Sequence, residues 1–176
     1  AEETGVDFVA LDVDPSSFSH PIERQRIGMY QRYYGGNMDE GWTRWLLEDF
    51  EFEYSSLLDP DILEGDLIDK WDVIILPADS KQMMLGLAGS SEGGGPDPSS
   101  TPPEYRSGFG QEGVEALEAF VQAGGTLVTF AEAGDLAIDE FELPVRNAVS
   151  GMSGNEFWAP GSTLKVDVDI SSPFAY

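Results

Sequence analysis

The clearest secondary-structure signal in this chain is the stretch Asp72-Val73-Ile74-Ile75-Leu76-Pro77. Its centre is a β-branched apolar run, which is typical of a strand buried on both faces. Proline cannot continue the hydrogen-bond ladder of a sheet, so we expect the strand to end before Pro77. The polar turn Ala78-Asp79-Ser80 follows at the carboxyl end. A strand of this kind predicts a parallel sheet covered by helices.

Similar strands are expected at 27–30, 127–130 and 51–58, working outward from this stretch. In the intervals between these strands, apolar residues recur every three or four positions, which predicts helices. One helix should follow Asn37, a good cap, and we expect it to face the core through Trp42, Trp45, Leu46 and Phe50. Further helices are expected near 60–70, from Gln111 to the Gly124-Gly125 pair through Val114, Leu117, Phe120 and Val121, and near 132–141.

Strands that alternate with helices predict an α/β fold of three layers, with a doubly wound, mostly parallel sheet. The flavodoxin-like and class I glutamine amidotransferase-like folds have this architecture. We expect residues 1–24 to be a lead-in or linker and residues 25–176 to form a single domain. A Gly, Ser and Pro-rich insertion at about 87–110 is expected to be flexible and poorly ordered without a ligand. Residues 164–170 alternate apolar and polar side chains, which predicts a half-buried strand.

The chain is strongly acidic, with 33 Asp and Glu against 9 Lys and Arg and a net charge of −24. Such a charge repels nucleic acids and anionic lipids, so neither is an expected partner. The surface suits a high-salt organism, since salt screens the self-repulsion; an acidic secreted domain is the alternative. No apolar run is long enough to span a membrane, and no signal peptide is recognisable, so we expect a soluble domain.

The chain has no cysteine and one histidine, His20. Thiol nucleophiles are therefore excluded, and a metal site is not expected. His20 and Glu23 have the His-x-x-Glu spacing of a zinc site, but a third ligand is missing, so we interpret the match as coincidence. Two acidic pairs, Asp59/Asp61 and Asp167/Asp169, lack the glycine and glutamate of an EF-hand calcium loop.

Ligands of doubly wound sheets bind beyond the carboxyl ends of the strands. The candidate ligand-binding residues at that edge are Tyr34, Asn37, Asp79 and Glu132. Glu132 follows a strand at a strand-to-helix turn, where class I glutamine amidotransferases carry the cysteine of a Gly-x-Cys-x-Gly elbow. Its carboxylate cannot form a thioester. Two interpretations stay open: Glu132 interacts with the dipole of the following helix, or it is the nucleophile of an unfamiliar hydrolase. We expect no catalytic residue.

Several blocks together resemble the C-terminal amidotransferase-like domain of bacterial zinc carboxypeptidases of the carboxypeptidase A type. The likeness extends over residues 24–176. It rests on Arg26–Tyr30 with Asn37–Glu48, on Asp72–Pro77, and on residues 102–105, 110–129, 143–147 and 157–162.

This resemblance implies a non-catalytic accessory domain of a zinc carboxypeptidase-like metallopeptidase. It implies that the zinc belongs to the preceding peptidase domain and that this segment holds no cofactor. The implied partners are that peptidase domain and, as a further candidate, its peptide substrate. It also implies export, secreted or periplasmic, and a chain cut from a longer protein. The alternative function is a small-ligand binding module that uses the strand-end crevice.

Overall fold

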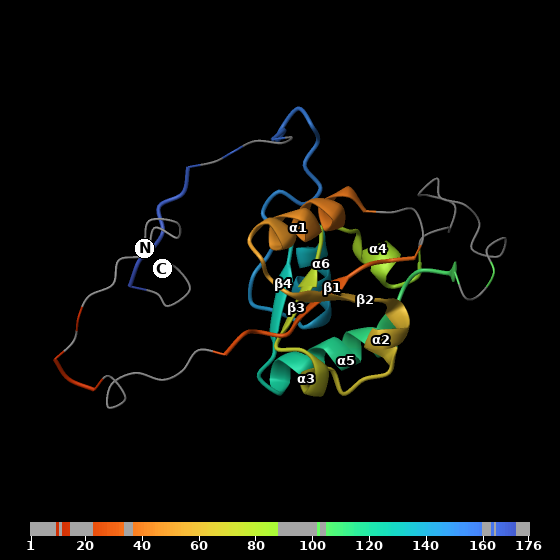
Figure 1. Cartoon of the computed structure of the whole chain (residues 1–176). Helices are drawn as coiled ribbons and strands as arrows, with labels where there is room; N and C mark the ends of the chain where they lie inside the picture. Colours follow the sequence, from red (N-terminus) through yellow and green to blue (C-terminus); the bar gives the residue numbers. More distant parts are fainter. Residues whose placement is uncertain are drawn as a thin grey trace.

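The computed structural model describes residues 10, 12–14, 23–33, 37–87, 102, 105–159, 163 and 165–171. Its centre is a sheet of four parallel strands in the order β2-β1-β3-β4 (Figure 1). The strands are β1 (Ile27–Tyr30), β2 (Tyr54–Leu57), β3 (Val73–Leu76) and β4 (Thr126–Thr129). In the register of the ladder, Ile27 is paired with both Tyr54 and Val73, and Val73 is paired with Thr126.

Helices separate the strands along the chain, as the sequence pattern predicts. They are α1 (Met38–Asp49), α2 (Asp59–Leu63), α3 (Leu67–Lys70), α4 (Lys81–Met84), α5 (Gly110–Gln122) and α6 (Ala133–Glu140). The single helix expected near 60–70 is two short helices, because Gly65 and Asp66 both adopt left-handed backbone angles between them. The predicted α/β, flavodoxin-like, three-layer fold is confirmed.

The sheet is covered unequally on its two faces. α1 lies on one side, and α2, α3 and α5 lie on the other (Figure 1). The larger buried cluster is on the second side; it includes Tyr30, Ile74, Leu76, Leu117 and Phe120. α6 adds Ala133 and Leu136 to this cluster. On the α1 side the buried set is small and consists of Ile27, Met29 and Ile75. The face of the sheet that α5 covers therefore holds most of the hydrophobic core.

The orientation of α1 contradicts the sequence prediction. Trp42, Trp45, Leu46 and Phe50, expected in the core, are between 49% and 66% exposed. The helix instead turns Glu40 and Arg44 towards the sheet, and Glu40 is its buried residue. The spacing predicted the helix correctly but assigned the wrong face to the core, because a paired charge network can replace apolar packing. Val121 of α5, also expected on a buried face, is 39% exposed.

The expected strand at 164–170 is not part of the sheet. Residues 165–169 have no regular structure, and Val166, Val168 and Ile170 are 70%, 56% and 76% exposed. The prediction for this segment is therefore wrong in the described conformation. Most of the predicted lead-in and most of the predicted insertion, including residues 88–101, lie outside the described residues.

The two ends of the insertion meet in the structure. Phe109 donates its amide proton to the carbonyl oxygen of Met84 at 2.8 Å, and Gly108 donates to Asp59 at 2.9 Å. Phe109 itself is buried and packs edge-to-face on Tyr30, with ring centroids 5.4 Å apart. The insertion therefore leaves and re-enters the domain at one fixed point beside the carboxyl end of β1.

Candidate functional site

The strand order places a topological switch point between β1 and β3. From β1 the chain continues to β2, towards one edge of the sheet. From β3 it continues to β4, towards the opposite edge. In open α/β sheets, ligands bind beyond the carboxyl ends of the strands at such a point. We call the residues that gather here, Arg32, Asn37 and Asp79, the strand-end site.

Asn37 joins the loop after β1 to the loop after β3. Its side-chain oxygen accepts hydrogen bonds from the amides of Asp39 at 3.0 Å and Glu40 at 3.2 Å, so it caps α1. Its side-chain amide donates to the carbonyl of Ala78 at 2.8 Å. Both ends of this side chain are therefore engaged in holding the two loops together.

Asp79 is buried at the strand-end site and forms an ion pair with Arg32. The Nε atom of Arg32 lies 2.6 Å from Oδ2 of Asp79, with side chains 16% and 6% exposed. Burial raises the pKa of Asp79, and this effect outweighs the opposing charge of Arg32 and the hydrogen bond from the Ser80 amide. Arg32 is a residue that the sequence analysis missed. Its position two residues after β1 could have indicated that it lies at the strand-end site, because ligands of such sheets bind beyond the carboxyl ends of the strands.

The returning end of the insertion lies beside this site. Tyr33 follows Arg32, and its ring packs edge-to-face on Tyr105 with centroids 5.5 Å apart. Tyr34, the other residue expected here, lies outside the described residues. The structure therefore brings Asn37 and Asp79 together, as their positions after β1 and β3 predict.

Glu132 lies at the turn between β4 and α6. It occupies the cap position of α6 in helical geometry, its side chain makes no capping hydrogen bond, and it is exposed. The left-handed residue of the turn is its neighbour Ala131, with φ of 46°. In a nucleophile elbow the sharp, strained turn presents the reactive side chain. Here the residue at the strained position is Ala131, whose methyl side chain cannot act as a nucleophile.

A second candidate site is the outer face of α1. We call Met38, Trp42, Trp45, Leu46 and Phe50 the α1 apolar face; Met38 is the most exposed, at 82%. Trp42 and Trp45 pack edge-to-face with centroids 6.2 Å apart. At the end of α1 this face meets a groove of about 370 Å³, lined by Glu23, Arg24, Gln25, Phe50, Glu51, Phe52 and Glu53.

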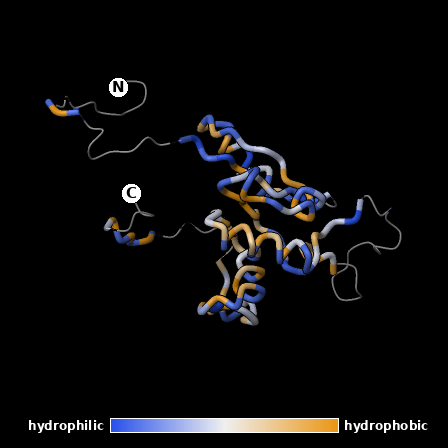
Figure 2. The backbone as a smooth tube through the Cα atoms, turned by 90° about the horizontal axis from the view of Figure 1, so that it is seen from below, coloured by the Kyte–Doolittle hydropathy of each residue, from blue (hydrophilic) through white to orange (hydrophobic). Residues whose placement is uncertain are grey.

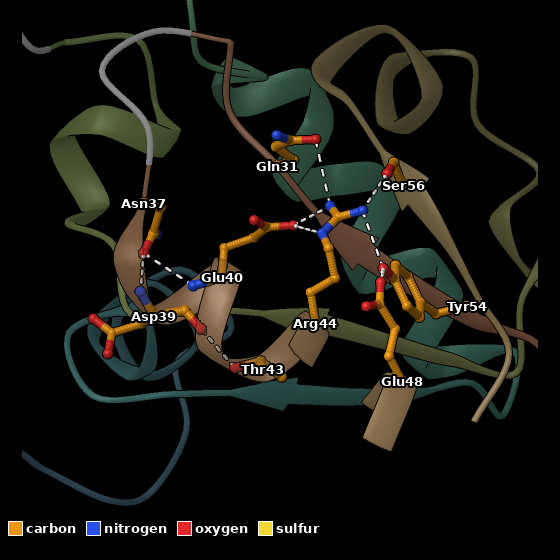
Figure 3. A network of polar contacts seen from close by, with 9 residues as sticks. All are labelled: Gln31, Asn37, Asp39, Glu40, Thr43, Arg44, Glu48, Tyr54 and Ser56. Atoms are coloured by element: carbon orange, nitrogen blue, oxygen red, sulfur yellow. Dashed lines mark hydrogen bonds and ion pairs between the residues drawn. The ribbon is translucent and has the colours of Figure 1, made fainter. Parts of the chain in front are cut away.

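A polar network fixes the rotation of α1 (Figure 3). Arg44 is paired with Glu40 and donates to the hydroxyl groups of Tyr54 at 3.3 Å and Ser56 at 3.2 Å, both on β2. Burial lowers the pKa of Arg44, but the hydrogen bonds and charges of Glu40 and Tyr54 together raise it by more. Tyr54 also donates to Glu48 at 2.5 Å. The inward face of α1 is thereby fixed as polar, which leaves its aromatic face in water.

Within the described residues there is no group of three or more His, Cys, Asp or Glu placed to hold a metal ion. His20, half of the His-x-x-Glu match, lies outside the described residues. Among the described helices, none has the length and apolar character needed to cross a membrane.

Comparison with family models, with curated proteins and with solved structures found no match. The candidate sites therefore rest on the geometry of this chain.

Proposed function

We propose that this chain is a non-catalytic accessory domain of a zinc carboxypeptidase-like metallopeptidase and that it docks on the peptidase domain through the α1 apolar face. The observation that carries the docking role is the exposure of two tryptophans in edge-to-face contact, Trp42 and Trp45, on one helix face. Tryptophan is enriched among the residues that dominate binding energy at protein interfaces. The identity of the partner rests on the sequence resemblance, which also supports export.

The chemistry of the chain supports a non-catalytic role. An amidotransferase needs a cysteine for its thioester, and the chain has none. Glu132 stands next to the strained position of the turn rather than on it. A carboxylate nucleophile also needs an acid or base beside it, whereas the Glu132 side chain is exposed and makes no capping hydrogen bond at its turn.

The first test is to read the full coding sequence of the protein. Upstream of residue 1 it should encode His-x-x-Glu followed by a later histidine, the zinc ligands of the peptidase domain. The second test measures binding of this chain to that peptidase domain by calorimetry. Replacing Trp42 and Trp45 together by serine should weaken binding at least about tenfold, as expected for the loss of interface hot spots.

Trp158→Ser is the matched control, since Trp158 is 76% exposed and lies outside the α1 apolar face. It should leave the affinity unchanged. Equal binding by all three proteins would contradict docking through α1.

A second candidate function, small-ligand binding at the strand-end site, is favoured by one observation: at the switch point, Asn37 donates a hydrogen bond to the carbonyl of Ala78, next to Asp79. In that case small-molecule fragments should change the NMR chemical shifts of residues near β1 and β3, and Asp79→Asn should alter these changes. The Trp42 and Trp45 variants should leave these shifts unaltered.

A further inference from the structure

The C-terminal end of α1 carries negative charge where a helix is stabilised by positive charge. Its last turn contains Glu48 and Asp49 and no basic residue. Because the carbonyl groups at a helix C-terminus carry partial negative charge, carboxylates there are unfavourable and cations are favourable. Glu48 accepts a hydrogen bond from Tyr54, whereas Asp49 is exposed. Local arrangements that lower stability are expected at functional sites, so this end of α1 indicates a site for a positively charged group.

Asp49 belongs to the same side of the helix as the exposed tryptophans. It follows Trp45 by four residues and Trp42 by seven, and residues at these spacings share a helix face. Asp39 comes three residues before Trp42 and borders the same face at its other end. The α1 apolar face therefore has a carboxylate at each end, and a partner that covers the tryptophans also lies next to these two charges.

The groove at the end of α1 repeats this combination of aromatic rings and carboxylates. Phe50 and Phe52, which line it, are 66% and 57% exposed, and they alternate along the chain with Glu51 and Glu53. The lining residues that the structure describes include one cation, Arg24, whose Nη1 atom lies 3.3 Å from Oε1 of Glu53 in an exposed ion pair. A further arginine or lysine from a partner fits such a groove, because its apolar stem packs on the rings while carboxylates bind its charged end.

We propose that the α1 apolar face and this groove bind a protein segment that carries arginine or lysine beside apolar side chains. The apolar side chains of the segment pack against Trp42 and Trp45. Its cation enters the groove, where Glu51 and Glu53 bind it next to the negative end of α1. This inference rests on the docking role proposed for α1, and it names the chemistry of the surface that docks there.

The charge of the whole chain favours a partner of opposite sign. A second copy is an unfavourable partner, because two chains that each carry a net charge of −24 repel one another. Hydrophilic residues occur all along the folded body, as the blue stretches in Figure 2 show. A cationic segment is therefore attracted to the whole surface, and the experiment has to separate the groove from this general attraction.

The probe is a synthetic helical peptide with leucine along one side and arginine at the borders of that side. The reference peptide has glutamine in place of every arginine. In about 0.1 M NaCl, where the screening length is about 10 Å, the arginine peptide should bind the chain at least about fivefold more tightly than the glutamine peptide. NMR should show shifts of the indole signals of Trp42 and Trp45. The indole signal of Trp158, which is also exposed, should stay in place.

A pair of charge variants separates the groove from the rest of the surface. Glu51→Gln with Glu53→Gln should weaken binding of the arginine peptide at least about fivefold and leave binding of the glutamine peptide unchanged. The matched control is Glu112→Gln with Glu115→Gln, which removes the same charge from exposed positions of α5, on the other side of the sheet (Figure 1). This control should weaken binding of the arginine peptide less than about twofold.

Equal losses in the two variants would overturn the inference, because the net charge of the chain would then account for the attraction. Unchanged binding by the groove variant, equal affinity for the two peptides, or an equal shift of the Trp158 signal would overturn it as well.

The same groove variant, measured against the peptidase domain, separates this inference from the proposed function. If replacement of Trp42 and Trp45 weakens that complex and the groove variant does not, docking through α1 stands and the cationic partner is refuted. If the arginine peptide binds the groove and the peptidase domain does not bind the chain, the accessory role is refuted and the chemistry of the docked segment stands.

Discussion

A Cβ atom built on Gly108 would stand 2.3 Å from the amide nitrogen of Gly86. The two glycines lie at the two ends of the insertion, so their backbones are in direct contact where the insertion leaves and re-enters the domain. Gly108 also has φ of 117°, which L side chains rarely adopt. A side chain at this position must therefore push the two ends of the insertion apart.

We predict that Gly108→Ala lowers the free energy of unfolding by about 3 kcal/mol or more, because backbone strain and overpacking add. Gly110→Ala is the matched control: its φ is 61°, but a Cβ there meets nothing within 4 Å. It should cost only the left-handed penalty of about 1–2 kcal/mol. Urea unfolding measures both, and equal losses would show that the contact with Gly86 does not matter.

We predict that Arg44→Met costs about 2 kcal/mol of unfolding free energy. The Arg44 side chain is 27% exposed and Glu40 is 7% exposed, so the substitution leaves a nearly buried carboxylate without its cation. Adding Glu40→Gln removes that charge and should recover part of the loss. A double variant no more stable than Arg44→Met would contradict this account of the network.

A third prediction concerns the α1 apolar face. Trp45 is 57% exposed, so Trp45→Ser should change the unfolding free energy by less than about 1 kcal/mol. Phe120 is 2% exposed in the core, and Phe120→Ala should cost about 3–5 kcal/mol. Thermal or urea unfolding compares the two. A large loss for Trp45→Ser would mean that the residue supports the domain itself.

The pH dependence of stability should reveal the pair formed by Arg26 and Asp72. The hydrogen bond from Arg26 lowers the pKa of Asp72 from 3.8 to about 2. A lowered folded-state pKa contributes stability above the unfolded value, and this contribution is lost as the pH falls through the folded value. The difference in unfolding free energy between the native chain and Asp72→Asn should thus be constant near neutral pH and shrink between pH 3.8 and about 2. A difference that is independent of pH would refute it.

Salt should stabilise the domain. The net charge is −24, and raising NaCl from about 0.1 M to about 1 M shortens the screening length from about 10 Å to about 3 Å. We expect the melting temperature to rise over this range. Sucrose at matched osmolality is the control for general exclusion from the surface. A melting temperature that salt leaves unchanged would argue against adaptation to a high-salt organism.

The sequence was sufficient for the parallel sheet, because the apolar runs at 27–30, 73–76 and 127–129 can be buried only under helices on both faces. The position of Asn37 and Asp79 was also predictable, since both follow strands that are neighbours. The position of Arg32 after β1 was visible in the sequence, but its ion pair with Asp79 was not predictable, because ion pairing depends on side-chain geometry that spacing does not encode.

The orientation of α1 could not be read from spacing for a related reason. Hydrophobic periodicity finds two opposite faces of a helix and assumes that the apolar one is buried. Arg44 reverses this assumption through its contacts with Glu40, Tyr54 and Ser56, which come from two separate segments. The alternation at 165–170 likewise predicted a strand, but residues 165–169 have no regular structure.

The all-parallel ladder has a consequence for how the chain folds. Every strand pair in β2-β1-β3-β4 is separated along the chain by at least one helix, so none of them can begin as a local hairpin. Sheets assembled from such distant contacts form more slowly than structures built from local contacts. Until the sheet forms, the strands of the newly made chain are unpaired. The net charge of −24 makes such chains repel one another, which opposes their aggregation during this time.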